Sequence, residues 1–106
     1  MRPKVFVTQY QPHLSFAEAE PWGDVVFLTD KEYRPEPVMP QTNERITHEV
    51  KKNFAEYLVG IDYIAVTGSS MPNLVVGILI ADIHGVHNIL KWSGRNRQYE
   101  LFKLKV

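Results

Sequence analysis

Residues 60–85 have the sequence GIDYIAVTGSSMPNLVVGILIADIHG, a buried strand followed by a polar turn and an apolar helix. Residues 63–66 are continuously apolar, which is typical of a strand covered on both faces, as in a parallel sheet. Pro72 is tolerated in the first turn of a helix, because its missing N–H would have no intrahelical partner there. The pattern predicts a strand over residues 63–66 and a helix over residues 71–85.

This predicted helix is apolar around nearly its whole circumference, and Ser69 or Ser70 is expected to cap its free backbone donors. Its apolar positions are Leu74, Val75, Val76, Ile78, Leu79, Ile80 and Ile83. Because these side chains point in nearly all directions, two apolar surfaces must cover the helix. The sheet supplies one of them. We expect a second subunit to supply the other, so that the protein forms a homodimer or a higher homo-oligomer.

Length and composition narrow the class of protein. The chain has 106 residues, enough for one domain over residues 1–106, and its 12 basic residues balance 12 acidic ones. This balance does not favour a polyanionic partner such as nucleic acid.

Cysteine is absent, which excludes disulfides, zinc–thiolate sites and thiol nucleophiles. The longest apolar run, residues 74–81, is far shorter than the ~20 residues of a membrane span. The apolar run at residues 5–7 is too short for the core of a signal peptide, so none is expected. We therefore expect a cytoplasmic protein, in the host cytoplasm if it is viral.

Four more strands are predicted, over residues 4–10, 24–28, 86–92 and 99–106. A turn of hairpin length that contains glycine separates the last two. Residues 99–106 alternate apolar side chains with lysines, a pattern typical of a half-exposed edge strand.

Two more helices are predicted between these strands. Ser15 and Glu18 match a capping box, so a short helix is expected there. A longer helix is expected to start at a cap on Thr42 or Asn43 and to end at Gly60. The apolar stripe of the longer helix consists of Ile46, Val50, Phe54, Tyr57 and Leu58. Its other face is charged and is expected to be solvated.

The order of elements predicts an α/β fold: a small three-layer, Rossmann-like domain with helices on both faces of a five-stranded sheet. Alternating strands and helices imply parallel strands joined by right-handed crossovers, and the final hairpin adds one antiparallel strand. We expect the strand order 2-1-3-4-5 in chain numbering. In such a sheet a crevice opens between strands 1 and 3 at their carboxyl ends.

This crevice is the predicted binding site. Its expected lining is Thr8, Gln9, Tyr10, Thr67, Gly68, Ser69 and Ser70. Hydroxyls, an amide and backbone N–H groups at a helix N-terminus suit a small anionic, nucleotide-like ligand. The turn matches neither the dinucleotide fingerprint nor a Walker loop, so a capped turn without a ligand remains an alternative, and no cofactor is indicated.

Metal binding and catalysis receive weaker support. Three potential metal ligands are Asp82, His84 and His87. They are distributed over the end of a predicted helix and the start of a predicted strand, so they do not share one face. Alternatively, a histidine at this place complements the partial negative charge of the last helical carbonyls. No metal is expected. The chain contains the residue types of a hydrolytic triad, namely Ser69 or Ser70, His13, and Asp24 or Asp62, but no motif that links them. The nucleophile motif GxSxG is absent, so no catalytic residue is predicted.

The C-terminal hairpin offers a second candidate surface. It carries Lys91, Trp92, Arg95, Arg97 and Tyr99. Basic residues between aromatic ones can bind nucleic acid, although the neutral total charge argues against it. The alternatives are a module that inhibits a host protein through this hairpin, or a solvated edge whose lysines prevent aggregation.

Short motifs spread over most of the chain suggest a family. A strand ends at Gln9, Ala17-Glu18 precede Gly23, a tyrosine-led strand ends at Gly68, and Leu90-Lys91-Trp92 precede a basic turn and Tyr99. This pattern resembles a set of small uncharacterised proteins encoded by phages and prophages. Those relatives carry Gly-Asp-Pro where this chain has Gly68-Ser69-Ser70, so a role for that acid does not transfer.

The resemblance implies a viral origin and no particular activity. Small phage proteins often sequester host molecules or bind host proteins. We therefore expect a non-enzymatic phage-type protein that binds a small nucleotide-like ligand at the crevice, such as a host signalling nucleotide, and thereby counteracts host defence.

Overall fold

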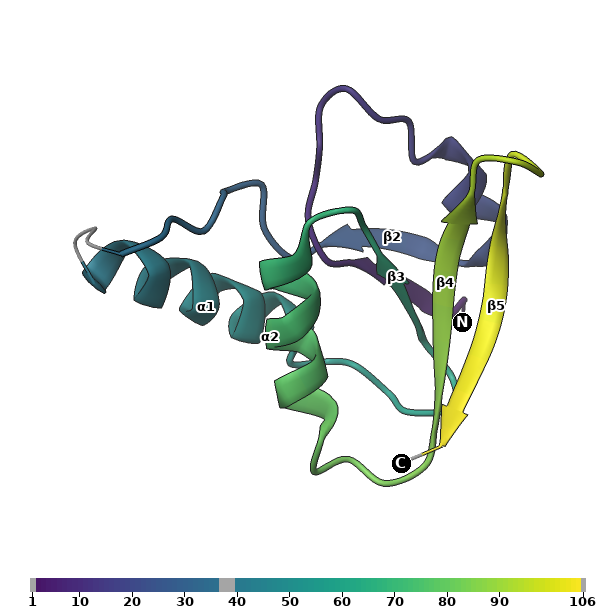
Figure 1. Ribbon diagram of the computed structural model, residues 1–106. Coiled ribbons are helices and arrows are strands. Elements are labelled where there is room, and N and C mark those ends of the chain that lie inside the picture. Colours follow the sequence, from purple (N-terminus) through teal and green to yellow (C-terminus); the bar gives the residue numbers. More distant parts are fainter. Residues whose placement is uncertain (1, 37–39, 106) are drawn as a thin grey trace.

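The computed structural model describes residues 2–36 and 40–105 (Figure 1). Its elements, in chain order, are β1 (Lys4–Val7), the 3₁₀ helix η1 (Ala17–Trp22), β2 (Asp24–Phe27), α1 (Pro40–Phe54), β3 (Tyr63–Val66), α2 (Ser70–Ile80), β4 (Val86–Ser93) and β5 (Gln98–Lys105).

The five strands form one sheet in the order β2-β1-β3-β4-β5, as predicted. β1 runs parallel to β2 and β3, β3 runs parallel to β4, and only β5 is antiparallel to its neighbour. Val7 of β1 lies opposite Phe27 on one side and Ala65 on the other. This central position explains why Val5, Phe6 and Val7 are all buried without any polar alternation.

The layers follow from the handedness of the crossovers. The chain moves one way along the sheet from β1 to β2, and the opposite way from β2 to β3 and from β3 to β4. Right-handed connections must then place η1 on one face and both α1 and α2 on the other. The two core clusters have this division: one contains residues of α1 and α2, the other contains Ala19 of η1. Helices therefore lie on both faces, as expected.

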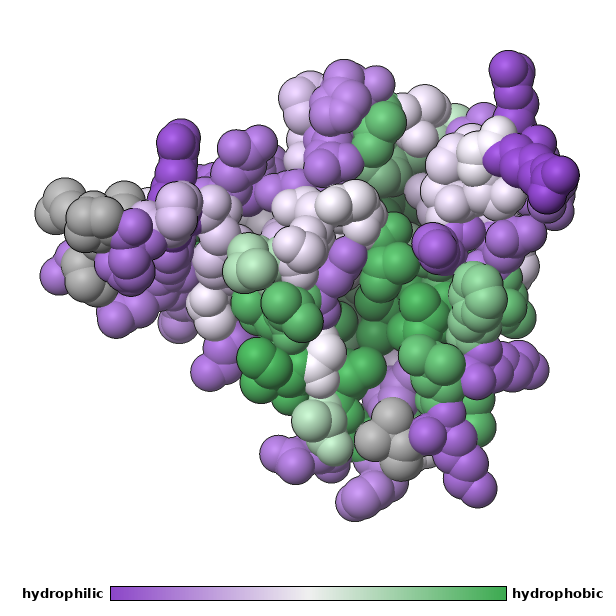
Figure 2. Space-filling model, in the orientation of Figure 1, coloured by the Kyte–Doolittle hydropathy of each residue, from purple (hydrophilic) through white to green (hydrophobic). Residues whose placement is uncertain are grey.

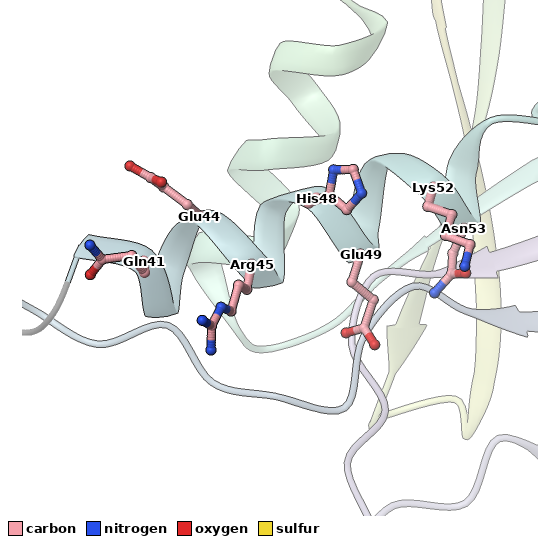
Figure 3. A pocket seen from close by; sticks show the side chains of 7 residues that line it. All are labelled: Gln41, Glu44, Arg45, His48, Glu49, Lys52 and Asn53. Carbon is pink, nitrogen blue, oxygen red and sulfur yellow. The ribbon is translucent and has the colours of Figure 1, made fainter.

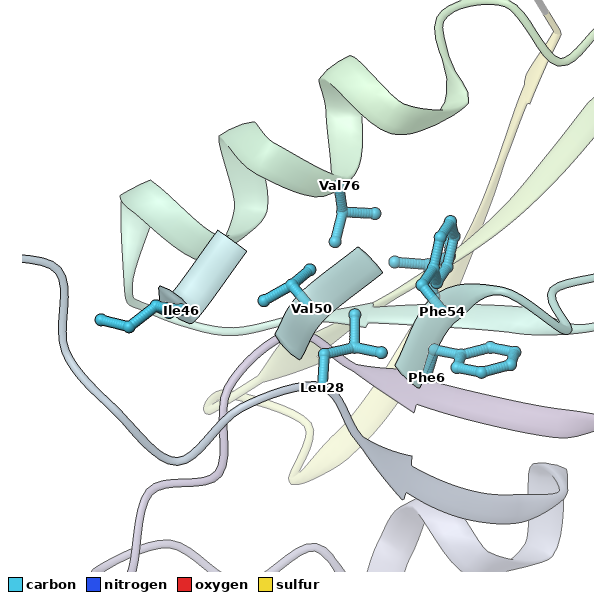
Figure 4. Packing of buried hydrophobic residues seen from close by; sticks show 7 residues of the cluster. Phe6, Leu28, Ile46, Val50, Phe54 and Val76 are labelled. Atoms are coloured by element: carbon cyan, nitrogen blue, oxygen red, sulfur yellow. The ribbon is translucent and has the colours of Figure 1, made fainter. Parts of the chain in front are cut away.

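The core on the helix side joins both α-helices to the strands. Figure 4 shows Val76 of α2, Val50 of α1 and Leu28, which follows β2, close together in this core. The buried members of the cluster are Phe6, Leu28, Ile46, Val50, Phe54, Ile64 and Val76. The ring centroids of Phe6 and Phe54 are 5.2 Å apart in an edge-to-face arrangement. Three positions of the predicted stripe of α1 therefore face the sheet.

The core on the η1 side is smaller, and small residues let the chain approach the sheet closely. Ala19 is fully buried there beside Val5 and Val7. At Gly23 a Cβ atom would lie 2.3 Å from the carbonyl oxygen of Pro3, so only glycine fits between η1 and β2.

The first predicted helix differs from expectation. η1 is a 3₁₀ helix whose N-cap, Phe16, makes no side-chain capping bond, so the capping box of Ser15 and Glu18 does not form. Ser15 Oγ instead accepts a hydrogen bond from the N–H of Ala17, at 3.3 Å. Pro21 lies inside this segment and lacks the N–H that a regular α-helix would use.

The predicted ends of the two α-helices are also corrected. α1 begins before Thr42 and Asn43, and the amide of Asn43 bonds to both the N–H and the carbonyl of Arg34 instead of capping. α1 ends at Phe54, before Gly60, and α2 ends at Ile80. Within the described part of the chain, no helix has the length and apolar character needed to cross a bilayer.

A buried histidine stabilises the turn after α2. His87 is fully buried, and its Nε2 lies 2.8 Å from the carbonyl oxygen of Ile83. Because a carbonyl can only accept, Nε2 carries the proton, and Nδ1 accepts from the Tyr57 hydroxyl at 2.5 Å. This carbonyl lies in the turn after α2, which ends at Ile80, so His87 does not contact the last helical carbonyls as predicted. Burial, and then the negative charge of Asp62, raises the pKa of Tyr57 to about 12.

The start of β1 and the loop before β3 are held by one buried carboxylate. Asp62 Oδ1 accepts from the N–H of Lys4 and Oδ2 from the N–H of Leu58, each at 2.9 Å. The side chain thus satisfies two backbone donors that belong to segments far apart in the sequence.

We predict that Asp62→Ala lowers the free energy of unfolding by about 2–4 kcal/mol, because two hydrogen bonds to a charged group are lost and two donors are left without it. The free energy of unfolding of Asp62→Asn should lie between those of the wild type and Asp62→Ala. The amide oxygen can still accept from one backbone donor, but the NH₂ group cannot accept from the other. Urea unfolding followed by circular dichroism measures this. The exposed Asp82→Ala is the control and should change stability by less than about 0.5 kcal/mol. Equal effects at both positions would contradict this role of Asp62.

We also predict a loss of stability at high pH that depends on Tyr57. Its pKa is raised in the folded state, so the neutral phenol is favoured there, whereas in the unfolded chain it ionises near pH 10. The stabilising contribution is therefore complete below pH 10 and is lost as the pH rises towards 12. Tyr57→Phe should be less stable at pH 8, and the difference from wild type should shrink between pH 10 and 12. A constant difference across this range, measured by chemical unfolding, would refute the prediction.

Candidate functional site

The ends of β1 and β3 lie side by side as predicted, but the side chain of Asn73 in α2 bonds to both of them and occupies the expected binding position. β1 and β3 are parallel neighbours, so Thr8 and Thr67 follow adjacent strand ends. Thr8 is fully buried, and its hydroxyl donates to Asn73 Oδ1 at 2.6 Å. It lies 3.2 Å from the hydroxyl of Thr67, from which it can therefore accept.

Asn73 also binds the backbone at the end of β3. Its Oδ1 accepts from the N–H of Thr67 at 3.3 Å, and its Nδ2 donates to the carbonyl of Thr67 at 2.7 Å. One amide thus ties β1, β3 and the first turn of α2 together. The polar atoms expected to face a ligand between β1 and β3 are bonded to one another.

The other predicted residues from the end of β1 have internal partners as well. Gln9 is buried, and its Nε2 donates to the carbonyl of Lys31 while its Oε1 accepts from Gln11. Tyr10 is half-exposed, with its ring 4.9 Å from that of Phe27. These contacts fix the path of the chain after β1.

The turn between β3 and α2 separates into an inner and an outer part. Ser69 occupies the N-cap position in an extended conformation but makes no side-chain capping bond, and its N–H donates to Thr67 Oγ1. Gly68 and Ser70 are exposed. Of the predicted crevice residues, only Thr67 and Gly68 line a concave surface beside β3 and β4.

We call this concave surface the hairpin cavity. Its volume is about 430 Å³, within the range of ~300–1,000 Å³ typical of small-molecule sites. It is lined by Leu14, Ser15, Phe16, Glu18, Val66, Thr67, Gly68, Lys91, Trp92 and Tyr99. It therefore joins the end of β3 to the loop after β1 and to the C-terminal hairpin, one strand away from the predicted crevice.

The hairpin forms a wall because β4 is twice as long as β3. Tyr63–Val66 pair with Asn88–Lys91, so Trp92 and Ser93 continue past the carboxyl end of β3. Trp92 lies opposite Tyr99 across the hairpin, with ring centroids 5.3 Å apart. Tyr99 is buried, whereas Trp92 is 41% exposed. An aromatic surface is thus presented to the cavity.

The loop after β1 forms the opposite wall. The ring of Phe16 packs edge-to-face on Phe27, with centroids 5.1 Å apart, which fixes the loop against β2. Glu18 of η1 adds a carboxylate to the lining. Burial, and then the negative charge of Glu18, raises the pKa of Tyr99, so its hydroxyl remains a neutral donor.

Cationic and hydroxyl groups complete the lining. Lys91 lies opposite Glu100 in the hairpin and next to Val66 in β3. Alternation along β4 places Lys91 on the helix side and Trp92 on the η1 side, so Lys91 contributes to the edge of the cavity at the strand ends. With Ser15, Thr67 and the phenol of Tyr99, the cavity offers three hydroxyls, one ammonium and one carboxylate.

A larger depression on α1 is a weaker candidate. It measures about 700 Å³, and all its lining residues belong to that one helix. Figure 3 shows their side chains leaving α1 in different directions, with Glu44 and His48 on one side and Arg45 and Glu49 on another. Polar groups that diverge from a single helix cannot enclose a ligand. This surface corresponds to the solvated face expected for α1.

The candidate metal ligands and the candidate hydrolytic residues are not arranged for either chemistry among the described residues. Within residues 2–36 and 40–105, no three histidine or carboxylate side chains come together as metal ligands. Asp24 begins β2 and Asp62 precedes β3, whereas Ser69 follows the carboxyl end of β3. A serine nucleophile and either carboxylate are therefore at opposite ends of the parallel strands.

Sequence reasoning placed part of this lining and missed the rest. Thr67 and Gly68 were expected at the crevice, and Lys91, Trp92 and Tyr99 at the hairpin, as two separate surfaces. Leu14, Ser15, Phe16 and Glu18 were not assigned to a site. The available signal was their place in the connection that leaves the carboxyl end of the first strand, an end expected to face a ligand.

Comparison with known proteins identifies a family. No curated protein and no solved structure matches the chain. The family model described as Phage Pam3 gp32-like protein matches residues 3–106, nearly the whole chain. This match confirms the resemblance to small phage-encoded proteins that the motifs suggested. The chain therefore belongs to the Phage Pam3 gp32-like protein family.

Proposed function

We propose that this phage protein is a non-enzymatic binder of a small, anionic, nucleotide-like ligand, and that the ligand occupies the hairpin cavity. The observation that carries the proposal is the meeting of Trp92 and Tyr99 with Thr67 and Gly68 in one cavity of about 430 Å³. In the host cell, such a protein would sequester a signalling nucleotide and so counteract host defence.

The aromatic rings suit the base of such a ligand. A flat heterocycle gains about 1–3 kcal/mol by stacking on an exposed aromatic side chain, and Trp92 is the most exposed of the three rings that line the cavity. Phe16 closes the space from the other side, while Leu14 and Val66 add apolar surface. The cavity is therefore apolar enough to favour a ring over water.

The polar groups suit the edges of a base and a phosphate. The carboxylate of Glu18 accepts hydrogen bonds from exocyclic amino groups, and the neutral hydroxyl of Tyr99 donates to ring nitrogens or carbonyls. Lys91 stands at the edge of the cavity, where its flexible stem can bring an ammonium group to a phosphate. The exposed backbone at Gly68 leaves the entrance open.

The crevice between β1 and β3 is the less suitable place for the ligand. The hydroxyl of Thr8 and the amide of Asn73 would have to give up mutual hydrogen bonds before they could bind anything else. Breaking a buried bond costs about 1–3 kcal/mol for each group left without a partner. The hairpin cavity requires no such rearrangement.

We predict that one class of nucleotide, from a panel that includes cyclic mono- and dinucleotides, raises the melting temperature and quenches tryptophan fluorescence. Trp92→Ala should weaken binding about tenfold or more, because stacking is lost. Titration calorimetry of wild type and variant measures the difference. A flat response across the panel, or equal affinity of the Trp92→Ala variant, would end the proposal.

Two glycines provide a matched steric test of the same site. At both Gly68 and Gly94 an added Cβ would meet no atom within 4 Å beyond the chain neighbours, so both positions have open space for a side chain. Gly68 lines the cavity, whereas Gly94 lies in the hairpin turn outside it. Gly68→Leu should block binding and Gly94→Leu should leave it unchanged. Equal affinities for the two variants would argue against the hairpin cavity.

The uneven charge of the chain favours a second candidate, a host protein that binds the hairpin. Residues 91–105 contain five basic and one acidic residue, net +4, while the other seven basic and eleven acidic residues give −4. Arg95 and Arg97 are exposed at the tip, and the ion pairs among described residues involve neither of them. An acidic protein surface would complement this end of the molecule.

This alternative predicts a partner that is lost when Arg95 and Arg97 are both changed to Glu. Binding from host lysate should weaken as salt is raised and should survive Gly68→Leu, which blocks only the cavity. Binding of an oligonucleotide in the same assay would identify a nucleic-acid partner instead. Retention of the partner by the double variant would refute the role of the arginines.

A further inference from the structure

The two α-helices of the same layer expose opposite kinds of surface. The exposed face of α1 is polar and consists of Gln41, Glu44, Arg45, His48, Lys51 and Lys52. The exposed face of α2 has no charged residue and includes Met71, Leu74 and Ile78, of which Leu74 is 57% and Ile78 73% exposed. A helix that faced only water would be expected to have a polar outer face, as α1 has.

The sheet has an uncovered part beside α2. Tyr99 belongs to the core on the η1 side, so alternation places Phe102 and Leu104 on the helix side of β5. These two side chains are 46% and 53% exposed, and the helix-side core contains no residue of β5 among the described residues. Figure 2 shows apolar side chains in a band that runs from α2 across to β4 and β5.

We propose that a second copy of this chain binds this band about a two-fold axis. In the dimer, α2 of each protomer covers the helix side of β5 of the other. Each protomer has one helix with an unpartnered outer face and one strand, β5, that adds no described residue to the helix-side core, whereas Ile89 of β4 already packs against that core. A two-fold arrangement buries both surfaces at once, because α2 of each copy then contacts the uncovered strand surface of the other copy.

The available area is sufficient for a dimer. Each of Met71, Leu74, Ile78, Phe102 and Leu104 leaves roughly 100 Å² exposed, so the two copies together offer on the order of 1,000 Å² of apolar surface. With a polar rim this reaches the ~1,200–2,000 Å² of a stable interface. On one copy the exposed apolar area is roughly 500 Å², in the upper part of the ~300–600 Å² range of a monomer's largest apolar patch, which is often functional.

Charge and packing also favour a second copy. Lys103 and Lys105 leave β5 on the η1 side, so they do not meet their own copies in this interface. Gly77 lies on the exposed face of α2 between Leu74 and Ile78, and no other protein atom lies within 4 Å of where its Cβ would be. A partner strand can therefore approach the helix backbone closely.

The oligomeric state tests the proposal. Sedimentation of the full chain should give a dimer at micromolar concentration, and Ile78→Glu should weaken it by roughly 30-fold or more, as expected for a central contact. The matched control is Ile61→Glu, a change at an equally apolar, 58% exposed residue of the loop before β3, which should remain dimeric. Both variants should keep the wild-type circular dichroism spectrum. A monomeric wild type at these concentrations, or equal loss in both variants, would overturn the proposal.

Cross-linking distinguishes the exchange from other arrangements, because the chain contains no cysteine of its own. A mixture of Ile78→Cys and Phe102→Cys chains should form a mixed disulfide dimer under mild oxidation, with little cross-linking in either chain alone. Disulfides within the Ile78→Cys sample alone would show helix–helix contact and would overturn the exchange. A monomer that captures a host protein through Ile78 would likewise overturn it. Dimer formation is independent of Trp92, so this proposal and the ligand proposal can fail separately.

Discussion

The interior strand β1 imposes the main constraint on this fold, because it has a parallel neighbour on each side and buried side chains on both faces. Parallel strands need crossovers, and the right-handed crossovers from β1 to β2 and from β2 back past β1 to β3 run in opposite directions, so they must pass on opposite faces. The position of η1 on one face and of α1 and α2 on the other follows from this. The same reversal brings the polar ends of β1 and β3 together.

Such a meeting of strand ends usually opens a binding crevice, but here it stabilises the fold. Asn73 projects from the first turn of α2 and binds both strand ends, so the polar groups are satisfied without a ligand. Concavity appears one strand further along. β4 and β5 extend past the end of β3, and the loop after β1 folds over the resulting step. Strand length, in addition to topology, thus places the cavity.

The hairpin has a different character on each face. On the η1 side, Trp92 and Tyr99 border the cavity, and Lys103 and Lys105 follow along β5. On the helix side, Phe102 and Leu104 are apolar and lack a cover. Period-two alternation therefore gives this strand pair one face for the proposed ligand and an opposite face for the proposed second copy of the chain.

Periodicity, turn residues and the order of elements determined the fold class, the strand order and the helix-side stripe of α1, because these depend on local burial patterns and on a general rule of handedness. Helix ends were less well predicted, since α1 and α2 stop where Asp62 and His87 bind the backbone of the following turns. From the sequence, the residues of the candidate site were predicted to form two separate surfaces, a crevice and a hairpin. Only the tertiary structure joined them, because the distance between Gly68 and Trp92 depends on strand register and on the step between β3 and β4. Whether a polar side chain faces a ligand or a neighbour, as with Asn73, is likewise decided by packing between distant segments and not by local sequence.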